Sequence, residues 1–571
     1  MQFFKNIPTI TAFDTENYQN NLKVICDAYG NFYEYDNNPE NLLNWLIEHS
    51  CDLNFLYNLD YDIAILYHAI NPKVDVDNNN HYSYGKYEFK YLSNKSLTII
   101  IHETKTRNKI IRFFDIAQFY KTDNFQSLDN VAKQVLGIGK NNEELGINRG
   151  KIGNEKGYYE QNRKLIIKYC IQDAYLTMEL AKKKIEALKL TLNNQYPKVF
   201  NSVASISKAY LSINHGNLVN SYYRLLNQLP LSKKSIANNI IENTFTGGLF
   251  YLHSLGKVNN VYEYDLNSAY PYAMTTLYSL EKANIRIVNK FEKSDYRFYK
   301  VKIRNLSYLP IHYRTDNTEI TYIRNKDYVE NFLTSAEIEY FQKYHAKEID
   351  IKIINGVVIN TTHKLEFTDF NELYNKRKEI KKEIKELKEN NKDYLKQDME
   401  QWNIKTILNA SYGTFAERKN GYTKFTNMVY ASYITALTRI KIYSIIDKIG
   451  FEHVKAIMTD AVATDIEIED KEFNSDGLGN FKLEENFNTV WFYMNGIYVY
   501  KKDKKIVIHN RGFPTLNNAD MLFNAKGTKL KVTNDKKVIK IKEGIIQHKQ
   551  QDIGKFTKQT KYLNLNSLIL R

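Results

Sequence analysis

Three acidic motifs follow one another in the N-terminal third of the chain, and their spacing limits the folds that can use them together. The first, AFDTEN, places Asp14 and Glu16 two residues apart in a strand-like run. Residues i and i+2 of a strand point to the same face, so both carboxylates can reach one metal ion. The second, YNLDYD, holds Asn58 and Asp62 where a helix-like run begins. Strand-like and helix-like runs alternate over residues 1–120, which predicts an α/β first third.

The third acidic motif, YCIQD, lies in a long run with helical pattern over residues 160–190. Tyr169 and Asp173 are four residues apart, so they share one helix face. Hydrolysis of a phosphodiester by two Mg²⁺ or Mn²⁺ ions, about 3.5–4 Å apart, needs three or four converging carboxylates, and a tyrosine can orient the attacking water. A DxE motif on its own is more often a pair of surface carboxylates. The three acidic motifs together, in this order, predict a metal-dependent nuclease.

The balance of charge points to a polyanionic partner. The 571 residues carry a formal net charge of +15, which favours nucleic acid, although a merely basic protein would have the same balance. From Lys526 to Arg571 there are twelve basic residues and three acidic ones. We therefore expect a basic C-terminal element that follows a phosphate backbone.

The cysteines and the hydropathy of the sequence indicate the cellular compartment of the protein. Cys26, Cys51 and Cys170 form no CxxC pair, which argues against a zinc site and favours a reducing compartment. No stretch approaches the roughly 18 apolar residues of a membrane span. The first residues, MQFFKNIPTI, lack the pattern of a signal peptide. We expect a cytoplasmic protein that does not enter a membrane.

A second group of polar residues begins in the string VYEYDLNSAYPYAM. Asp265 ends an apolar strand, and a carboxylate in that position can hold Mg²⁺. The turn that follows, with Leu266 and Ser268, can offer backbone N–H groups to a triphosphate, and Tyr270 can pack against a sugar. The alternative is a strand and turn with an incidental aspartate.

The string KTILNASYGTF lies in residues 366–416, which are almost wholly helical in pattern. Lys405, Asn409 and Tyr412 occur at i, i+4 and i+7 and so line one helix face. Lys405 can neutralise charge on an incoming triphosphate, and Asn409 and Tyr412 can frame a base pair. Gly413 allows the backbone to bend or to approach another group closely.

Together these strings resemble the motifs of protein-primed family B DNA polymerases, the type found in small phages and linear plasmids. The acidic set resembles the three exonuclease motifs of ribonuclease H-like proofreading domains. The string around Asp265 is similar to motif A, DxxSLYP, with Ala269 in place of Leu. KTILNASYG is similar to motif B, KxxxNSxYG, with Ala410 in place of Ser. The resemblance extends from Phe13 to about Gly512.

Motif C departs from the family pattern YxDTDS. In HVKAIMTDAVATDIEI, one alignment makes Asp460 the carboxylate that pairs with motif A on both metal ions, with Met458 at the family's first Asp. The other alignment makes Asp460 the first Asp and puts Val462 at the essential position. We favour the first, because Val462 then continues the strand alternation directly after the turn. Asp465, five residues beyond Asp460, is expected to lie too far away to replace the missing Asp, although Asp465 or Glu467 can supply charge there.

Other marks of the family are partial. FTGG resembles the YxGG motif between the two activities, with Phe245 in place of Tyr, and GIYVY falls where the family has KxY, with Gly496 in place of Lys. QSLDNVAKQVLG resembles a motif that contacts single-stranded DNA, although Ser127 is as readily a helix N-cap, and Lys140 aligns loosely with the exonuclease lysine. The resemblance assigns DNA contacts to Asn58, Ser127, Leu128, Phe245, Gly247, Gly248 and Tyr498.

The implied fold is α/β and α+β multidomain, with a ribonuclease H-like exonuclease domain and a palm–fingers–thumb polymerase domain. We expect the exonuclease at 1–195, connecting helices and the FTGG joint at 196–260, and the polymerase domain at 261–571. Within the last, the palm is expected at 261–365 and 417–512, the fingers at 366–416 and the thumb at 513–571. Only 46 residues separate Gly413 from Asp460, which is short for the family's second insertion.

The implied function is DNA-directed synthesis from dNTPs with 3′–5′ proofreading, and with two Mg²⁺ or Mn²⁺ ions per active site. The resemblance also implies a monomer, primed by a terminal protein, in a host cytoplasm or, for a linear plasmid, in mitochondria. Two alternatives stay open. One is an exonuclease whose synthetic site is degenerate, and the other is a nucleic-acid-binding scaffold without catalysis.

Overall fold

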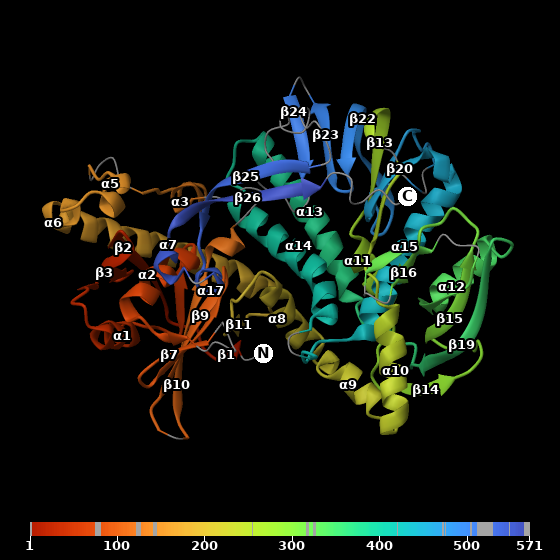
Figure 1. The fold of residues 1–571 in the computed structure, drawn as a ribbon, viewed down its shortest axis with the longest axis horizontal. Helices are drawn as coiled ribbons and strands as arrows, with labels where there is room; N and C mark the ends of the chain where they lie inside the picture. The colour runs from red at the N-terminus through yellow and green to blue at the C-terminus, as the bar shows by residue number, and fades with distance from the viewer. Residues whose placement is uncertain are drawn as a thin grey trace. The chain divides into compact units, whose positions relative to one another are not determined.

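Two compact units make up the chain in the computed structural model (Figure 1). The structure describes residues 3–74, 81–104, 106–120, 127–140, 146–253, 255–315, 319–323, 327–418, 421–470, 473, 475–502, 505–510, 529–547 and 549–564. Unit 1 consists of Met1–Ile213, Ile380–Thr406 and Asn534–Gln559, and unit 2 of Asn214–Glu379, Ile407–Thr533 and Thr560–Arg571.

A nine-stranded sheet forms the centre of unit 1, in the order β4-β3-β2-β5-β10-β9-β8-β7-β6. β2 pairs in parallel with β5, which pairs in parallel with β10, and the helices between them confirm the expected α/β first third. Its strands are β2 (Ile10–Tyr18), β3 (Asn21–Asp27), β4 (Phe32–Glu34), β5 (Leu53–Leu56), β6 (Lys73–Val74), β7 (His81–Tyr84), β8 (Tyr87–Leu92), β9 (Ser96–His102) and β10 (Asn108–Asp115). A separate pair is formed by β1 (Phe3–Phe4) and β11 (Tyr196–Pro197).

Helices pack against this sheet through apolar side chains. α1 begins at Pro39 because the side chain of Asn38 accepts hydrogen bonds from the first free amides of the helix. The long helix predicted over 160–190 is confirmed as α7, which lies on β2, where Cys170 Sγ donates to the carbonyl of Asp14 at 3.3 Å. The helices are α1 (Pro39–Glu48), α2 (Leu59–Ile70), α3 (Leu128–Leu136), α5 (Arg149–Asn154), α6 (Tyr158–Gln161), α7 (Arg163–Thr191) and α8 (Ala204–Asn214).

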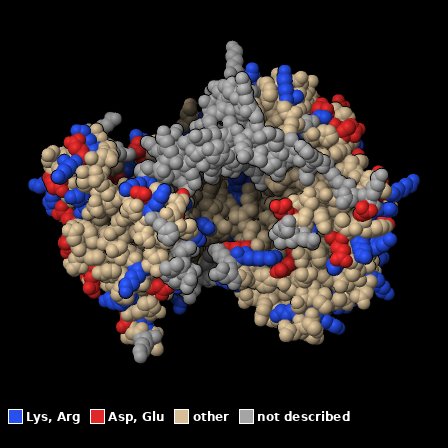
Figure 2. Space-filling view, in the orientation of Figure 1, with Lys and Arg blue, Asp and Glu red and all other residues tan. Residues whose placement is uncertain are grey.

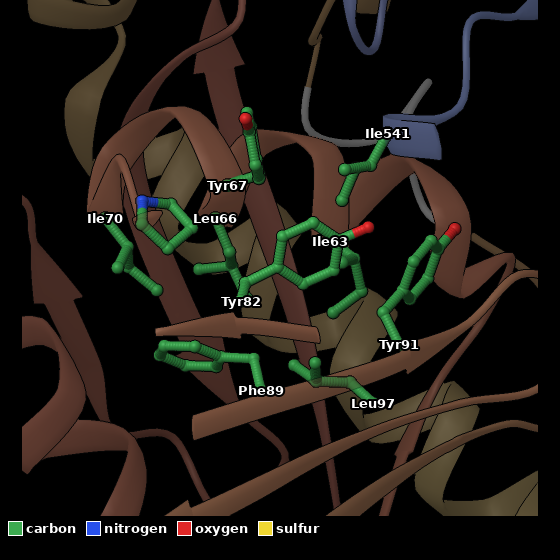
Figure 3. A pocket seen from close by; sticks show the side chains of 10 residues that line it. Ile63, Leu66, Tyr67, Ile70, Tyr82, Phe89, Tyr91, Leu97 and Ile541 are labelled. Atoms are coloured by element: carbon green, nitrogen blue, oxygen red, sulfur yellow. The ribbon is translucent and has the colours of Figure 1, made fainter. Parts of the chain in front are cut away.

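A C-terminal segment completes the core of unit 1. Ile541, at the start of α17 (Ile541–Ile546), faces an apolar pocket formed with Ile63, Tyr82 and other side chains of α2 and the β7–β9 strands (Figure 3). Ile553 is buried in the same core. The flanking strands are β25 (Lys529–Val538) and β26 (Phe556–Asn564). Residues 534–559 thus group with unit 1, whereas the sequence assigns them to the thumb; the domain boundaries themselves remain predictions.

Unit 2 is built on two sheets, of order β12-β20-β21-β13-β22-β23-β24 and β14-β19-β15-β18. Residues 450–510 contain most strands of the first sheet. Their strands are β12 (Leu249–Leu252), β13 (Gly256–Leu266), β14 (Asn284–Val288), β15 (Tyr296–Asn305), β18 (Val329–Thr334), β19 (Ile349–Asn360), β20 (Val454–Thr459), β21 (Ala461–Thr464), β22 (Phe481–Met494), β23 (Ile497–Lys502) and β24 (Lys505–Asn510). A separate pair is formed by β16 (Ile311–Arg314) and β17 (Ile320–Ile323).

A buried helix, α15 (Met428–Ile449), packs between these sheets, and its Ile442 and Ile446 join one core with Tyr264 and Val301. The other helices of unit 2 are α9 (Ser221–Leu226), α10 (Leu231–Thr244), α11 (Ala269–Thr275) and α12 (Ser335–Tyr344). The helical stretch predicted over 366–416 is confirmed as α13 (Asp369–Glu389) and α14 (Leu395–Ala416), which belong partly to each unit.

The surface carries charges of both signs. On the face in Figure 2, basic and acidic side chains lie next to one another over much of the described surface, so net charge alone does not mark a binding site. Among the helices that the structure describes, none has the length and apolar character needed to span a bilayer.

Candidate active sites

The four carboxylates of the acidic motifs gather in unit 1. Asp14 and Glu16 come from β2, Asp62 from the first turn of α2 and Asp173 from α7. Burial raises the pKa of Asp14 well above its ordinary value, and the negative charges of Asp173, Asp62 and Glu16 raise it further, while Lys140 opposes them. The carboxylates therefore lie close enough to repel one another, as residues that share metal ions do.

Asp62 is buried, and burial raises its pKa to about 7. Thr15 donates a 2.7 Å hydrogen bond to its Oδ1 atom. Because Thr15 lies between Asp14 and Glu16 on β2, this bond fixes α2 relative to the strand that carries the other two carboxylates. The DxE spacing thus provides two potential ligands and the group that orients a third.

Tyr169 and Asp173 lie on one face of α7, and the ammonium group of Lys140 contacts both. Lys140 Nζ donates to the Tyr169 hydroxyl at 3.0 Å and forms an ion pair with Asp173. The assignment of Lys140 as the family's exonuclease lysine stays a prediction. Lys140 offsets part of the negative charge that the four carboxylates place here.

The residues of unit 1 that were predicted to contact single-stranded DNA lie in different local environments. Asn58 adopts a left-handed conformation with φ 61° before α2. Ser127 is the N-cap of α3 and accepts from the amide of Asn130 at 3.3 Å, as the alternative interpretation expected. Leu128 is buried against Leu176 on α7, so its side chain is not presented to a ligand in this structure.

One carboxylate was missed by the sequence analysis. Asp115 ends β10, is fully buried, and accepts hydrogen bonds from the amides of Asn58 (3.1 Å) and Ala117 (2.9 Å). Its charge also raises the pKa of Asp62. The only signal was an aspartate at the end of the apolar run IIRFFD, and strand pairing with β5 brings it to the site.

In unit 2, the aspartates of motifs A and C meet at adjacent strands. Asp265 on β13 pairs with Ala461 on β21, and the amide of Leu266 donates to the carbonyl of Asp460 at 2.8 Å. Burial raises the pKa of Asp265 to about 7, and Asp460 is the largest electrostatic contributor, followed by Glu484 and Glu263. The central pair of the predicted polymerase site is therefore brought together.

The favoured alignment of motif C agrees with this geometry. Thr459 and Asp460 form the turn between β20 and β21, with Met458 opposite Ala461. Val462, which the other alignment puts at the essential position, pairs with Tyr264 and is buried in the core.

Met458 and the two further acidic residues of motif C lie in different environments. Met458 is 7% exposed and packs against Ala461 and Phe487. Asp465 is paired with Lys455 (2.7 Å) and His453 (2.9 Å), so each of its carboxylate oxygens has a basic partner. Glu467 is exposed beyond the end of β21.

Two carboxylates of neighbouring strands were not predicted. Glu263 lies on β13 and Glu484 on β22, at an irregularity in the pairing of these strands. Burial raises the pKa of Glu263, and Tyr498 on β23 donates to it at 2.9 Å. Tyr498 is itself buried, so its predicted DNA contact is not available in this structure. Gly496, in place of the family's lysine, has φ 76° in the β22–β23 turn, a conformation that lysine adopts only with strain.

The nucleotide-binding residues predicted from motifs A and B include one aromatic contact. The rings of Tyr270 and Tyr412 lie 4.2 Å apart between centroids at an angle of 35°. Ser268 has φ 49° in the turn between β13 and α11. On α14, Lys405 and Asn409 are exposed, whereas Tyr412, predicted on the same face, is half-buried; Gly413 is also exposed.

The FTGG segment approaches motif C closely. A Cβ atom on Gly248 would lie 2.5 Å from Cγ2 of Thr459, so only glycine fits. The carbonyl of Gly247 accepts a 2.6 Å hydrogen bond from Arg439, which forms a buried ion pair with Glu337 at 2.7 Å. Phe245 is half-buried just before this turn.

The donor sets of both sites fit Mg²⁺ or Mn²⁺, which prefer carboxylate oxygens. Within the described residues, no three acidic, histidine or cysteine side chains converge tightly enough to hold an ion as they stand. The pKa values of Asp14 and Asp265 are raised first by burial and then by neighbouring carboxylates, and a bound cation would offset both effects.

Known proteins share both sequence and fold with this chain. Residues 115–476 match the family described as DNA polymerase type B, organellar and viral. A DNA polymerase of Acidianus bottle-shaped virus (isolate Italy/Pozzuoli) is 30% identical over 285 residues, which cover 48% of this chain and 40% of that protein. The chain thus spans well under half of that relative's length.

Solved structures of Phi29 DNA polymerase share the fold. The orthorhombic crystal form and the complex with primer-template DNA and incoming nucleotides each have a TM-score of 0.64 at 12% identity. The complex with single-stranded DNA has a TM-score of 0.59 at 13% identity. Each match covers 98% of this chain and 100% of the other. The fold class predicted from the sequence is confirmed, and the chain belongs to the organellar and viral family of type B DNA polymerases.

Proposed function

We propose that the chain is a DNA-directed DNA polymerase that joins dNTPs to the 3′ hydroxyl of a primer. The observation that carries this proposal is the meeting of Asp265 and Asp460 at the end of β13. Two adjacent carboxylates at strand ends suit the two divalent cations of nucleotidyl transfer. The family match supports the same activity.

In this proposal, Asp265 and Asp460 would hold two Mg²⁺ or Mn²⁺ ions, and these ions would supply positive charge to stabilise the transferred phosphoryl group. Lys405 neutralises charge on the triphosphate, and the turn at Ser268 offers backbone amides to it. Tyr270 and Tyr412 form an aromatic wall for the incoming nucleotide. The primer hydroxyl attacks the α-phosphate, and pyrophosphate leaves.

The same chain carries a proposed 3′–5′ proofreading exonuclease. Asp14, Glu16, Asp62 and Asp173 would bind the metal ions, and Tyr169 would orient the attacking water. The charge crowding at Asp14 supports this assignment. Asp14→Ala is expected to abolish 3′ trimming of single-stranded DNA and to leave primer extension intact; trimming at the wild-type rate would refute the assignment.

Priming by a terminal protein is a further part of the proposal. It rests on the resemblance of the motifs to the protein-primed type and on the fold shared with Phi29 DNA polymerase. The protein would act as a monomer in a host cytoplasm, or in mitochondria for a linear plasmid. Its test is the joining of a labelled dNMP to a protein hydroxyl without a nucleic-acid primer. Label found only on nucleic acid would contradict it.

An exonuclease with a degenerate synthetic site is the second candidate, because Met458 and Gly496 replace a carboxylate and a lysine of the family. Primer extension by the wild-type protein with dNTPs and Mg²⁺ separates the two. Extension supports the polymerase, whereas trimming without any extension supports the degenerate site.

A further inference from the structure

Lys184 is a buried lysine that neither proposed active site uses. It lies on α7 and is 2% exposed, which places it among the most buried large side chains in the described part of the chain. Its Nζ atom donates to Oδ1 of Asn403 and lies 4.3 Å from the ring centroid of Trp402, both on α14. These three residues belong to unit 1.

Such a lysine is costly to bury, so its position calls for a physical reason. Burial lowers the pKa of Lys184 to about 7. An amide oxygen and an aromatic face stabilise an ammonium group less than a carboxylate does. An apolar side chain of the same length would fill this space at lower cost, and it would leave the orientation of Asn403 undetermined.

A second buried hydrogen bond holds α14 three residues further on. The hydroxyl of Ser207, on α8, donates to the backbone carbonyl of Thr406 at 3.0 Å. Both residues are buried. Lys405, whose side chain is exposed, therefore lies between Asn403 and Thr406, each held by a polar contact to a different helix of unit 1.

These contacts fix both the rotation and the axial position of α14 at Lys405. A helix turns by about 100° per residue, so a small rotation moves an exposed lysine far from its ligand. Apolar packing of Ile404 alone would allow α14 to rotate or shift along its axis. Directional hydrogen bonds at Asn403 and Thr406 favour a single rotation and axial position.

We propose that Lys184 is a positioning residue for nucleotide binding: its contact with Asn403 and Trp402 sets the rotation of α14 at Lys405, the residue proposed to bind the triphosphate. The inference rests on the proposed polymerase function.

The test uses the full chain with Lys184→Met, which keeps side-chain length and removes the donor. The matched control is Lys182→Met on the same helix, where a half-exposed lysine is paired with Glu179. The measurements are the dissociation constant of a dNTP on a dideoxy-terminated primer-template, the KM and kcat of extension, and 3′ trimming of single-stranded DNA.

We expect Lys184→Met to raise the dNTP dissociation constant and KM by about tenfold, the usual scale of one charged hydrogen bond. We expect kcat at saturating dNTP and the trimming rate to stay within about twofold of the control. An unchanged dNTP affinity would overturn the proposal. Equal losses of trimming and dNTP binding would also overturn it, because they indicate a general folding defect.

A double-mutant cycle gives an independent readout. If Lys184 and Asn403 act only through their shared hydrogen bond, Lys184→Met combined with Asn403→Leu raises the dNTP dissociation constant no more than either change alone. Multiplying effects would contradict the pairing. Measuring the dNTP dissociation constant requires no turnover. A protein that binds dNTP but does not extend a primer would therefore refute the polymerase proposal and still test the Lys184–Asn403 contact.

Discussion

The backbone amide of Leu266 donates a 2.8 Å hydrogen bond to the carbonyl oxygen of Asp460, where β13 passes the turn between β20 and β21. This bond joins motif A to motif C at the residue next to Asp265. The two aspartates are therefore neighbours on adjacent strands, and their mutual repulsion helps to raise the pKa of Asp265. Each prediction for synthesis depends on this relationship.

Met458 is predicted to act only through packing. Met458→Leu conserves volume in its apolar cluster, so we expect primer extension within about twofold of wild type and a loss of less than about 1.5 kcal/mol in the free energy of unfolding. Steady-state extension and thermal unfolding measure the two effects. A loss of extension without a loss of stability would mean that the thioether has a direct role.

Tyr498 is predicted to stabilise the palm through Glu263. Tyr498→Phe removes the donor of the 2.9 Å hydrogen bond to a carboxylate whose pKa burial already raises. We expect a loss of about 1–3 kcal/mol in the free energy of unfolding, because that carboxylate loses a partner. Tyr493→Phe, on the adjacent strand β22, is the control. Equal stability of the two variants would show that the hydrogen bond contributes little.

The buried ion pair beneath FTGG is predicted to be essential for stability. Glu337→Gln leaves Arg439 buried without its countercharge and should cost about 3–5 kcal/mol, with a lower thermal midpoint. Glu339→Gln removes the half-exposed partner of Arg297 and should cost at most about 1 kcal/mol. Similar midpoints for both variants would contradict the difference in burial.

The lowered pKa of Lys184 predicts a specific pH dependence of stability. Burial moves this pKa from 10.5 to about 7, so between these values the unfolded chain binds a proton that the folded chain lacks. The free energy of unfolding should therefore rise with pH over this window, by up to about 1.4 kcal/mol per unit, and level off below pH 7. Lys184→Met should lack this rise. Parallel pH profiles of the two proteins' thermal midpoints would refute it.

Local patterns predicted much of the candidate sites. Strand alternation brought Asp14 and Glu16 to one face, and helical spacing did the same for Tyr169 and Asp173, because both depend on neighbours in sequence. The alternation of Val462 after the turn also identified the alignment of motif C that the geometry favours.

Long-range pairing decided what the sequence could not predict. Glu263 and Glu484 approach Asp265 only because β13 and β22, far apart in the chain, pair with an irregular register. Asp115 reaches the exonuclease site through the pairing of β10 with β5. The burial of Leu128 and Tyr498 likewise depends on partners in other elements, so motif resemblance alone suggested exposed DNA contacts.

The most direct test of the account is primer extension by wild type and Asp460→Asn side by side, with Asp465→Asn as the control. Asp465 is engaged with Lys455 and His453, so its variant should extend normally. We predict that Asp460→Asn loses at least about 10³-fold in extension and keeps wild-type 3′ trimming. Extension by Asp460→Asn at the rate of the control would contradict the placement of synthesis at Asp265 and Asp460.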